Sequence, residues 1–264
     1  MVTLRSDVVG IDAAIMMNPK VWEVSGHVGA FTDPLVECLA CHVRVRADKK
    51  EEIEAHEKTH EENSDWTEPK KFNLLVKAYL GVVEGEQSEI FLRGEITQGA
   101  FVNFENVVSS TRVKIPFGIA QIGKAFRNEI TPGNFTYRSR EFEQMELEFF
   151  VQPQDAEGDK WFEYWKEERL NWYKSLGMNS LKLRFRKHED DERAHYAKYA
   201  EDIEFDAPFG WSEFEGIHHR GDWDLSRHKL GYTDDTGQKF TPWVIETSGG
   251  VDRAALFFLL EVYS

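Results

Sequence analysis

The chain has 264 residues, of which 41% are hydrophobic and 13% aromatic, so it can bury a sizeable core in one large domain or two small ones. Its composition is not that of a disordered chain, and with no run of about 18 apolar residues it predicts no membrane span. The net charge of −15 disfavours strong non-specific binding to nucleic acid, although a local basic patch would suffice for a specific partner.

The start of the chain, MVTLRSDVVG, lacks the basic and then apolar pattern of a secretion signal. The two cysteines, Cys38 and Cys41, form a C-x-x-C pair without the wider framework of a disulfide-bonded protein. Together these features predict a protein of a reducing compartment, the cytoplasm.

The Cys38–Cys41 pair is followed by His56 and His60, which lie one helical turn apart. Two thiolates and two imidazoles can complete the tetrahedron that zinc prefers. However, 14 residues separate Cys41 from His56, against about 12 in the common zinc-finger pattern. Residues 48–63, DKKEEIEAHEKTHEEN, are almost entirely polar, so the alternative is a solvated helix without a metal.

Two predicted strand regions carry polar residues on a single face. An apolar strand is predicted over 72–85, FNLLVKAYLGVVEG, and beyond it Arg93 and Glu95 are two residues apart, so they share one strand face. Near the end of the chain, Glu246 and Ser248 share a strand face in the same way, before a glycine pair breaks the strand. Each pattern has the plain alternative of an ordinary exposed strand face.

The stretch 118–151 reads as two alternating strands joined by a polar loop that contains the turn residues Pro-Gly-Asn. On the return strand the apolar residues alternate with a ring and three polar side chains: Phe142, Gln144, Glu146 and Glu148. If the hairpin pairs antiparallel, Arg127 and Glu129 join that open face. An arginine, carboxylates and an aromatic ring suit a nucleotide. The alternative is an amphipathic hairpin with a salt-bridged outer face.

Helices are predicted at 155–176 and 253–263. In the first, Trp161, Trp165, Trp172 and Leu176 recur at helical spacing and predict core packing. The second is apolar almost all round, which predicts a buried helix. Two metal-like motifs are rejected, because HEDDER at 188–193 is a charge run typical of a solvated face and the adjacent His218 and His219 point apart on a strand.

The residues FRNE, a loop with a second arginine and then REFEQMELEFF resemble motif 2 of class II aminoacyl-tRNA synthetases, in the form found in glycyl-tRNA synthetases. Other stretches match that family in order: W-x-x-S-G-H-x-x-x-F-x-D-P after Pro19, then LRGEITQGAFVNF, GWSEFEG and ETSGGVDR, the last in the place of motif 3. The chain departs from the family pattern at Gly94 and Thr247, where proline is usual, and at Ile96, where threonine is usual.

The resemblance implies an α+β fold, the class II catalytic core, with an antiparallel β-sheet flanked by helices. It implies one catalytic core over 1–264 with an insertion at 36–70 that includes the cysteine pair. The long helix of motif 1 and the anticodon-binding domain are expected to be absent from this sequence. Because that helix helps to build the family's dimer interface, the usual homodimer is in doubt.

The resemblance also implies that glycine is activated with ATP and Mg²⁺ and transferred to the 3′ acceptor end of tRNA(Gly), with no membrane partner. Arg127 and Arg253 are the implied catalytic residues. The implied ATP-binding residues are Arg127, Asn128, Glu129, Tyr137, Arg138, Phe142, Glu213, Phe214, Gly250, Asp252 and Arg253. The implied glycine-binding residues are Arg46, Glu95, Phe142, Gln144, Glu146, Glu246 and Ser248. Glu213 is the expected Mg²⁺ ligand. Cys38, Cys41, His56 and His60 are candidate zinc ligands on their spacing, with the solvated helix as the alternative.

Two other functions remain open at this point. A catalytically impaired fragment or a non-enzymatic class II paralogue that binds protein or RNA would explain the missing helix and domain. The intact arginines and carboxylates of motifs 2 and 3 argue against it, since a binding module has no need of them. The third hypothesis, a small zinc-dependent RNA-binding domain, is based on Cys38 and Cys41 alone.

Overall fold

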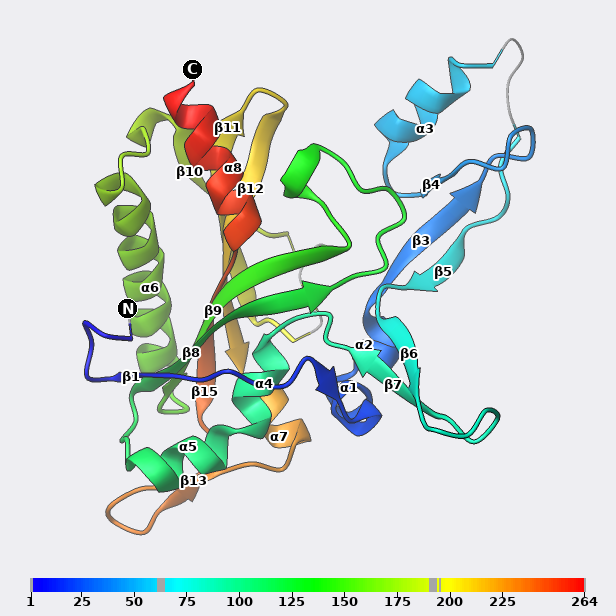
Figure 1. Cartoon of the computed structure of the whole chain (residues 1–264). Helices are drawn as coiled ribbons and strands as arrows, with labels where there is room; N and C mark the ends of the chain where they lie inside the picture. Colours follow the sequence, from blue (N-terminus) through cyan, green and yellow to red (C-terminus); the bar gives the residue numbers. More distant parts are fainter. Residues whose placement is uncertain (1, 61–64, 190–193, 195, 264) are drawn as a thin grey trace. The chain divides into compact units, whose positions relative to one another are not determined.

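The computed structural model describes residues 2–60, 65–189, 194 and 196–263, and the chain divides into two compact units (Figure 1). Unit 1 contains residues 1–15, 95–125 and 142–264, and unit 2 contains residues 16–94 and 126–141. Each unit has its own sheets and helices, so the two are described separately.

Among its described residues, unit 1 is built on a seven-stranded sheet (Figure 1). The order of the strands is β1 (Val8–Gly10), β8 (Phe117–Phe126), β9 (Glu141–Val151), β15 (Trp243–Gly250), β12 (Gly210–Gly221), β11 (Tyr199–Ala207) and β10 (Leu183–Lys187). From β9 to β10 every neighbouring pair is antiparallel, and β1 pairs parallel with β8. The predicted antiparallel sheet is therefore confirmed, with one parallel strand added at its edge.

Helices cover both faces of this sheet. Helix α6 (Asp155–Ser175) contacts β12 and β15, and its Phe162 and Trp165 are buried against Phe149 of β9. On the other face, α4 (Thr97–Val102) and α5 (Phe104–Thr111) bury Phe101 and Phe104 against Phe150. The remaining elements of unit 1 are the turn η2 (Ser180–Lys182), α7 (Trp223–Arg227), the hairpin β13 (Tyr232–Thr233) and β14 (Lys239–Phe240), and α8 (Val251–Val262).

Unit 2 contains two small antiparallel sheets within its described part, ordered β2-β7-β6 and β4-β3-β5. Their strands are β2 (Met16–Met17), β3 (Thr32–Glu37), β4 (Arg44–Arg46), β5 (Lys70–Asn73), β6 (Val76–Leu80) and β7 (Ser88–Leu92). The helical elements are α1 (Pro19–Ser25), α2 (His27–Ala30), α3 (Lys50–Glu57) and the turn η1 (Phe135–Tyr137).

Three expectations about local structure need correction. The predicted strand over 72–85 is two strands, β5 and β6, because the side chain of Asn73 accepts a hydrogen bond from the Leu75 N–H (2.8 Å) and turns the backbone between them. The helix at 155–176 is confirmed, but Trp172 and Leu176 lie outside the core. Helix α8 is also not buried all round: it packs through Ala254 and Phe257, while Leu259 is 55% exposed.

Candidate active site

The face of the unit 1 sheet opposite α6 carries a row of acidic and polar side chains. In the register of β9 and β15, Glu148 lies opposite Glu246 and Glu146 lies opposite Ser248. Because side chains two residues apart on a strand share a face, all four point to the same side of the sheet. Glu95, just before α4, is buried like the three other glutamates. We call Glu95, Glu146, Glu148 and Glu246 the carboxylate cluster.

Glu146 is held by hydrogen bonds from three side chains. The hydroxyl of Thr97 donates to its Oε2 (2.5 Å), and the hydroxyl of Ser248 donates to its Oε1 (2.7 Å). The amide nitrogen of Gln144 also donates to Oε1 (2.8 Å). These donors come from α4, β15 and β9, so the carboxyl group is fixed on a rigid framework.

Glu246 contacts a buried guanidinium and a histidine side chain. The guanidinium NH1 of Arg220 donates to its Oε2 (2.5 Å), and Nδ1 of His218 lies 2.6 Å from its Oε1. Arg220 also forms a two-pronged ion pair with Asp224, which lies in α7. Since the side chains of Arg220 and Asp224 are each only 1% exposed, water does not weaken this pair.

Glu95 belongs to a neighbouring hydrogen-bond chain. The side-chain amide of Gln98 donates to Glu95 Oε1 (3.2 Å) and to Asp224 Oδ1 (2.9 Å). Nε2 of His228 lies 3.0 Å from the Gln98 Oε1. The chain therefore links Glu95 through Gln98 to Asp224, the residue that also binds Arg220.

Burial and mutual repulsion change the acidities of the carboxylate cluster. Burial, with repulsion from Glu246 and Glu95, raises the pKa of Glu146 to about 8. Burial and the charge of Glu246 raise the pKa of Glu148 well above its usual range. Burial alone would also raise the pKa of Glu246, but Arg220 and His218 hold it below the ordinary value. Of these three groups, Glu246 is thus the stable carboxylate, whereas Glu146 and Glu148 ionise readily only beside a cation.

Some buried polar atoms on this face lack a hydrogen-bond partner among the described residues. These atoms are the two carboxyl oxygens of Glu148 and the side-chain amide oxygen, Oε1, of Gln144. Buried polar atoms are nearly always satisfied in folded proteins, so an unsatisfied group indicates a place for a ligand or water. A small cation with several N–H donors, such as a primary ammonium group, fits this surface of acceptors.

The beginning of α8 contributes a second predicted part of the site within unit 1. Gly250 precedes the helix, and Asp252 in its first turn accepts a hydrogen bond from the Glu143 N–H (2.7 Å). The NH1 of Arg253 lies 2.8 Å from the Glu213 Oε1, so two of the predicted ATP residues form an ion pair. Glu213 is partly exposed and offers carboxylate oxygens, the ligands that Mg²⁺ prefers, so it fits the expected role.

Phe142 and Phe214 take different positions in unit 1. Phe142 lies near the start of β9 and is half-buried. Phe214 is fully buried, with its ring 3.9 Å from that of Tyr173 and 5.1 Å from that of Phe257. Phe214 is thus a core residue, and its contact with a nucleotide stays a prediction.

The predicted residues Arg127, Asn128, Glu129, Tyr137 and Arg138 lie in unit 2. The Arg127 guanidinium lies 5.2 Å from the centre of the Phe31 ring, and its Nε donates to the Gly94 carbonyl (3.0 Å). Glu129 is buried, and its Oε2 lies 3.6 Å from the Arg138 NH1. Asn128 binds the Leu74 carbonyl through its N–H (2.8 Å), and Tyr137 ends η1.

Arg127 and Glu129 lie beyond the end of β8, and the prediction that they join the open face of the return strand stays a prediction. β8 ends at Phe126, and the Glu129 N–H turns back to the Arg127 carbonyl (2.7 Å). This turn ends the strand alternation on which that prediction is based.

Arg46 is engaged by carboxylates of its own unit. Its NH1 donates to Asp33 Oδ2 (2.6 Å), and its Nε and NH2 donate to the two oxygens of Asp48. Burial raises the pKa of Asp33, and the positive charge of Arg46 opposes that shift. The contact of Arg46 with glycine stays a prediction.

Several members of the unit 1 site escaped the sequence analysis. Arg220, Asp224 and His218 lie in GIHHRGDWD, where the histidine pair drew attention to metal binding instead. His218 faces Glu246, whereas His219 is buried beside Trp243 with its pKa lowered by burial to about 4. The rejection of a paired-histidine metal site is consistent with that geometry. Residues 190–193 of HEDDER lie outside the described residues.

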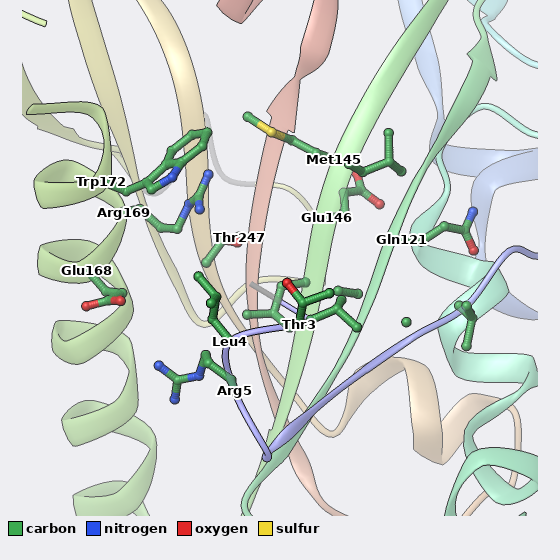
Figure 2. Close-up of a pocket in the computed structure, with 16 residues that line it drawn as sticks. Thr3, Leu4, Arg5, Gln121, Met145, Glu146, Glu168, Arg169, Trp172 and Thr247 are labelled. Carbon is green, nitrogen blue, oxygen red and sulfur yellow. The ribbon is translucent and has the colours of Figure 1, made fainter. Parts of the chain in front are cut away.

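A cavity of unit 1 lies mainly between the sheet and α6. It has a volume of about 720 Å³ and is lined by residues 2–5, by Met145 and Thr247, and by Arg169 and Trp172 of α6 (Figure 2). Met145 and Thr247 alternate with Glu146 and Glu246 along their strands, so most of this lining lies on the α6 side of the sheet, and Glu146 also lines the cavity.

The sheet, the buried acidic face and the glycine-led helix α8 define a class II synthetase core, and the chain belongs to that family. Residues 82–263 match the family model described as tRNA synthetase class II core domain (G, H, P, S and T). None of the described helices has the length and apolar character that a membrane span requires.

Curated relatives narrow the comparison to glycine–tRNA ligases. The chain is 49% identical to the one from Ruminiclostridium cellulolyticum and 47% identical to the one from Alkaliphilus oremlandii, over 97% of this chain in both cases. This chain is also 47% identical to the glycine–tRNA ligase of Streptomyces coelicolor, over 100% of this chain. The chain spans about 62% of the length of each of these relatives.

Solved structures share the fold at low sequence identity. Prolyl-tRNA synthetase from Giardia lamblia, in complex with prolyl-adenylate, aligns with 96% of this chain and 42% of its own, with a TM-score of 0.65 and 16% identity. The enzyme from Cryptosporidium parvum, with halofuginone and AMPPNP, aligns with a TM-score of 0.64 and 14% identity, over 95% of this chain and 42% of its own.

Proposed function

We propose that this chain activates glycine with ATP and passes it to the 3′ end of tRNA(Gly), as the name of its relatives, glycine–tRNA ligase, describes. The observation that carries the proposal is the carboxylate cluster on a rigid sheet face. Glycine has no side chain, so an enzyme can recognise it only by its ammonium group, its carboxylate and its small size.

The ammonium group would bind between Glu95, Glu146 and Glu246. Its positive charge removes the repulsion that keeps Glu146 protonated, so the acid loses its proton as the cation enters. Ser248, which is hydrogen-bonded to Glu146, would lie beside the glycine Cα and leave no room for a methyl group.

In the first step a carboxylate oxygen of glycine attacks the α-phosphorus of ATP, a P–O bond forms, and pyrophosphate leaves. This step needs alignment and charge stabilisation more than a general base. On the family resemblance, Arg127 stabilises the α-phosphate and Arg253 the γ-phosphate. Phe142 stacks on the adenine, Glu129 accepts from its amino group, and Arg138 lies near the triphosphate tail. Mg²⁺, which Glu213 would help to hold, neutralises phosphate charge when it is bound.

In the second step a ribose hydroxyl at the tRNA 3′ end attacks the carbonyl carbon of the glycyl-adenylate, and AMP leaves. The net charge of −15 implies that contact with tRNA depends on local arginines and lysines. A homodimer stays a prediction, as do the roles assigned to individual residues.

The test is ATP–pyrophosphate exchange by the purified chain, with glycine, alanine and serine compared side by side. We expect exchange with glycine alone, and a charging assay with tRNA(Gly) then tests the second step. Folded protein that binds ATP but exchanges with none of the three amino acids would contradict the proposal and favour a non-enzymatic binding module.

A further inference from the structure

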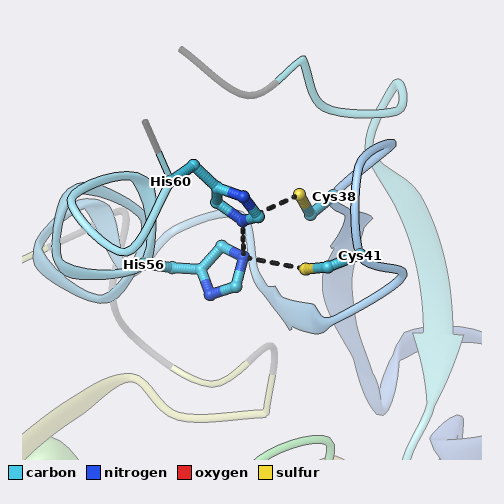
Figure 3. A group of neighbouring side chains, drawn as sticks. All are labelled: Cys38, Cys41, His56 and His60. Carbon is cyan, nitrogen blue, oxygen red and sulfur yellow. Dashed lines mark hydrogen bonds between the residues drawn. The ribbon is translucent and has the colours of Figure 1, made fainter. Parts of the chain in front are cut away.

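A second cluster of ionisable side chains lies in unit 2, apart from the predicted glycine and ATP residues. Cys38 follows β3, and Cys41 lies in the loop between β3 and β4. His56 is in the last turn of α3, and His60 lies just beyond that helix. Figure 3 shows the two sulfur atoms and the two imidazole rings turned toward one another. We call these four residues the Cys/His cluster.

The distances within the Cys/His cluster are those of ligands around one ion. All four donor atoms lie within 4.8 Å of one another. Cys38 Sγ is 3.7 Å from His60 Nε2, and Cys41 Sγ is 3.2 Å from His56 Nε2. The two Nε2 atoms are 3.1 Å apart. Zinc bond lengths in a tetrahedron imply about 3.5 Å between sulfur and nitrogen and about 3.3 Å between nitrogens.

Hydrogen bonds alone do not account for this arrangement. Each Nε2 faces two partners, a sulfur atom and the other Nε2. A ring nitrogen either donates one proton or accepts through one lone pair, so it cannot serve two partners in different directions well. A cation at the centre of the cluster receives a lone pair from each of the four atoms and satisfies them together.

The loop that carries the cysteines is closed by its own backbone. The Cys38 N–H donates to the Val43 carbonyl (2.9 Å), and the His42 N–H donates to the Cys38 carbonyl (2.9 Å). His42 adopts a left-handed conformation, with φ of 61°, which lets the chain turn back after Cys41. The turn holds both thiols on one side before any ligand arrives.

Helix α3 lacks the usual means of attachment to a fold. None of its eight residues, all of which are described, is buried, and its first turn has no side-chain cap. A helix this short is unstable alone, and helices in proteins depend mainly on a packed apolar face. Outside the Cys/His cluster, side chains of its last turn contact Trp66: the indole donates a hydrogen bond to Glu57 (3.0 Å), and its ring lies against that of His56.

We propose that Cys38, Cys41, His56 and His60 bind one zinc ion, which fastens α3 to the hairpin of β3 and β4. Two sulfur and two nitrogen donors favour zinc over magnesium or calcium, which prefer oxygen. Four protein ligands leave no open position for a substrate, so the site is structural. Through β3 and β4 the ion also stabilises the strands that pair Arg46 with Asp33.

The first test is metal content of the reduced full chain after incubation with zinc and removal of excess metal. We expect one zinc per chain in the wild type and less than about a tenth of that in Cys41→Ser and His60→Gln. His42→Gln is the matched control, because His42 lies in the same loop but its Nδ1 faces Glu37 (2.9 Å), and it retains one zinc. Folded, reduced wild-type chain that binds no zinc, or variants that keep it, would overturn the proposal.

The second test separates ligation from a general effect on folding. Cobalt(II) in place of zinc is expected to give the visible spectrum of a tetrahedral site with thiolate bands in the wild type, and to lose those bands in Cys41→Ser. Removal of zinc by a chelator is expected to speed amide hydrogen exchange in α3 by about tenfold or more, with α6 unchanged as an internal control. Equal exchange in α3 with and without metal contradicts the structural role. Neither measurement depends on glycine activation.

Discussion

The carboxylate cluster and the Cys/His cluster both gather four ionisable side chains, but they are organised in opposite ways. Three of the carboxylates lie on β9 and β15 in a wide sheet with helices on both of its faces, and Glu95 lies just before α4. The Cys/His cluster joins a hairpin to a helix without a buried residue. The first arrangement exists because the fold imposes it, at an electrostatic cost. The second has no buried helix residue to support it, and we expect the proposed zinc ion to stabilise it.

This contrast has a physical origin. Repulsion among Glu95, Glu146 and Glu246 is sustained because the aromatic core under the sheet supplies far more stability than the repulsion removes. A preorganised acidic pocket can then recognise an ammonium group without rearranging. Segment 48–60 has no buried residue, so we expect its order to depend on the proposed zinc ion.

The largest expected effect is a loss of stability when the buried arginine beside the carboxylate cluster is removed. Arg220→Met leaves Glu246 and Asp224 buried without their cation, so we expect the free energy of unfolding of unit 1 to fall by about 3–5 kcal/mol. Urea denaturation followed by tryptophan fluorescence measures it. Arg44→Met is the control from unit 2, because Arg44 pairs with Glu37 at an exposed site and its loss is expected to change little. Equal stability of Arg220→Met and wild type would show that the buried pair is not a support.

The next effect concerns recognition by the carboxylate cluster. Glu146→Gln keeps the shape of the side chain and removes the charge, so we expect the KM for glycine in pyrophosphate exchange to rise by about 10- to 100-fold, as the loss of a charged hydrogen bond implies. The KM for ATP is expected to change by less than about twofold. Glu105→Gln, on the exposed side of α5, is the matched control. Similar losses for glycine and ATP would count against the assignment.

The pH dependence follows from the raised pKa of Glu146, about 8 in the free protein. Below that pH the carboxyl group is protonated and must release its proton when the ammonium group binds. Glycine affinity is therefore expected to rise with pH, by up to about tenfold per unit, and to level off above pH 8. Calorimetry in buffers of different ionisation enthalpy measures the released proton, and Glu146→Gln should remove that release. If the Glu146→Gln variant still releases a proton when glycine binds, that proton comes from another group.

The same shift has a consequence for folding. A carboxyl group whose pKa is raised in the folded state stabilises the protein below its ordinary pKa, and that stability is lost as the pH rises through the folded value, about 8. The free chain is thus expected to become less stable between pH 5 and 8 at this site. Bound glycine should reduce that loss.

The smallest expected effect tests one hydrogen bond. Ser248→Ala removes the donor to Glu146 Oε1, so we expect glycine affinity to fall by about fivefold, the worth of roughly 1 kcal/mol. Zinc content, which belongs to the other cluster, should remain equal to that of wild type. A change in zinc content with no change in glycine affinity would reverse the roles given to the two regions.

Much of the architecture follows from local sequence patterns. The alternation between Phe142 and Val151 correctly separates the face with Glu146 from the apolar face under α6, because strand geometry alone sorts neighbouring side chains. The 155–176 helix and the strand before Gly250 were predicted on similar grounds. The exposure of Trp172 and Leu259 could not be predicted in this way. Periodicity shows which residues share one face of a helix, but not whether another element covers that face.

By itself, the sequence determined the sheet faces, the family resemblance and the residue types that a cation would meet. Only the tertiary structure decided which charges neutralise one another. Arg220 reaches Glu246 because β12 lies beside β15, and Glu148 faces Glu246 because β15 lies beside β9. The paired residues lie up to about a hundred positions apart in the sequence. Strand order and register bring them together, and no local sequence pattern predicts that pairing. The four residues of the Cys/His cluster meet for the same reason: a turn and a short helix, each predictable from its own sequence, come together only in the folded unit.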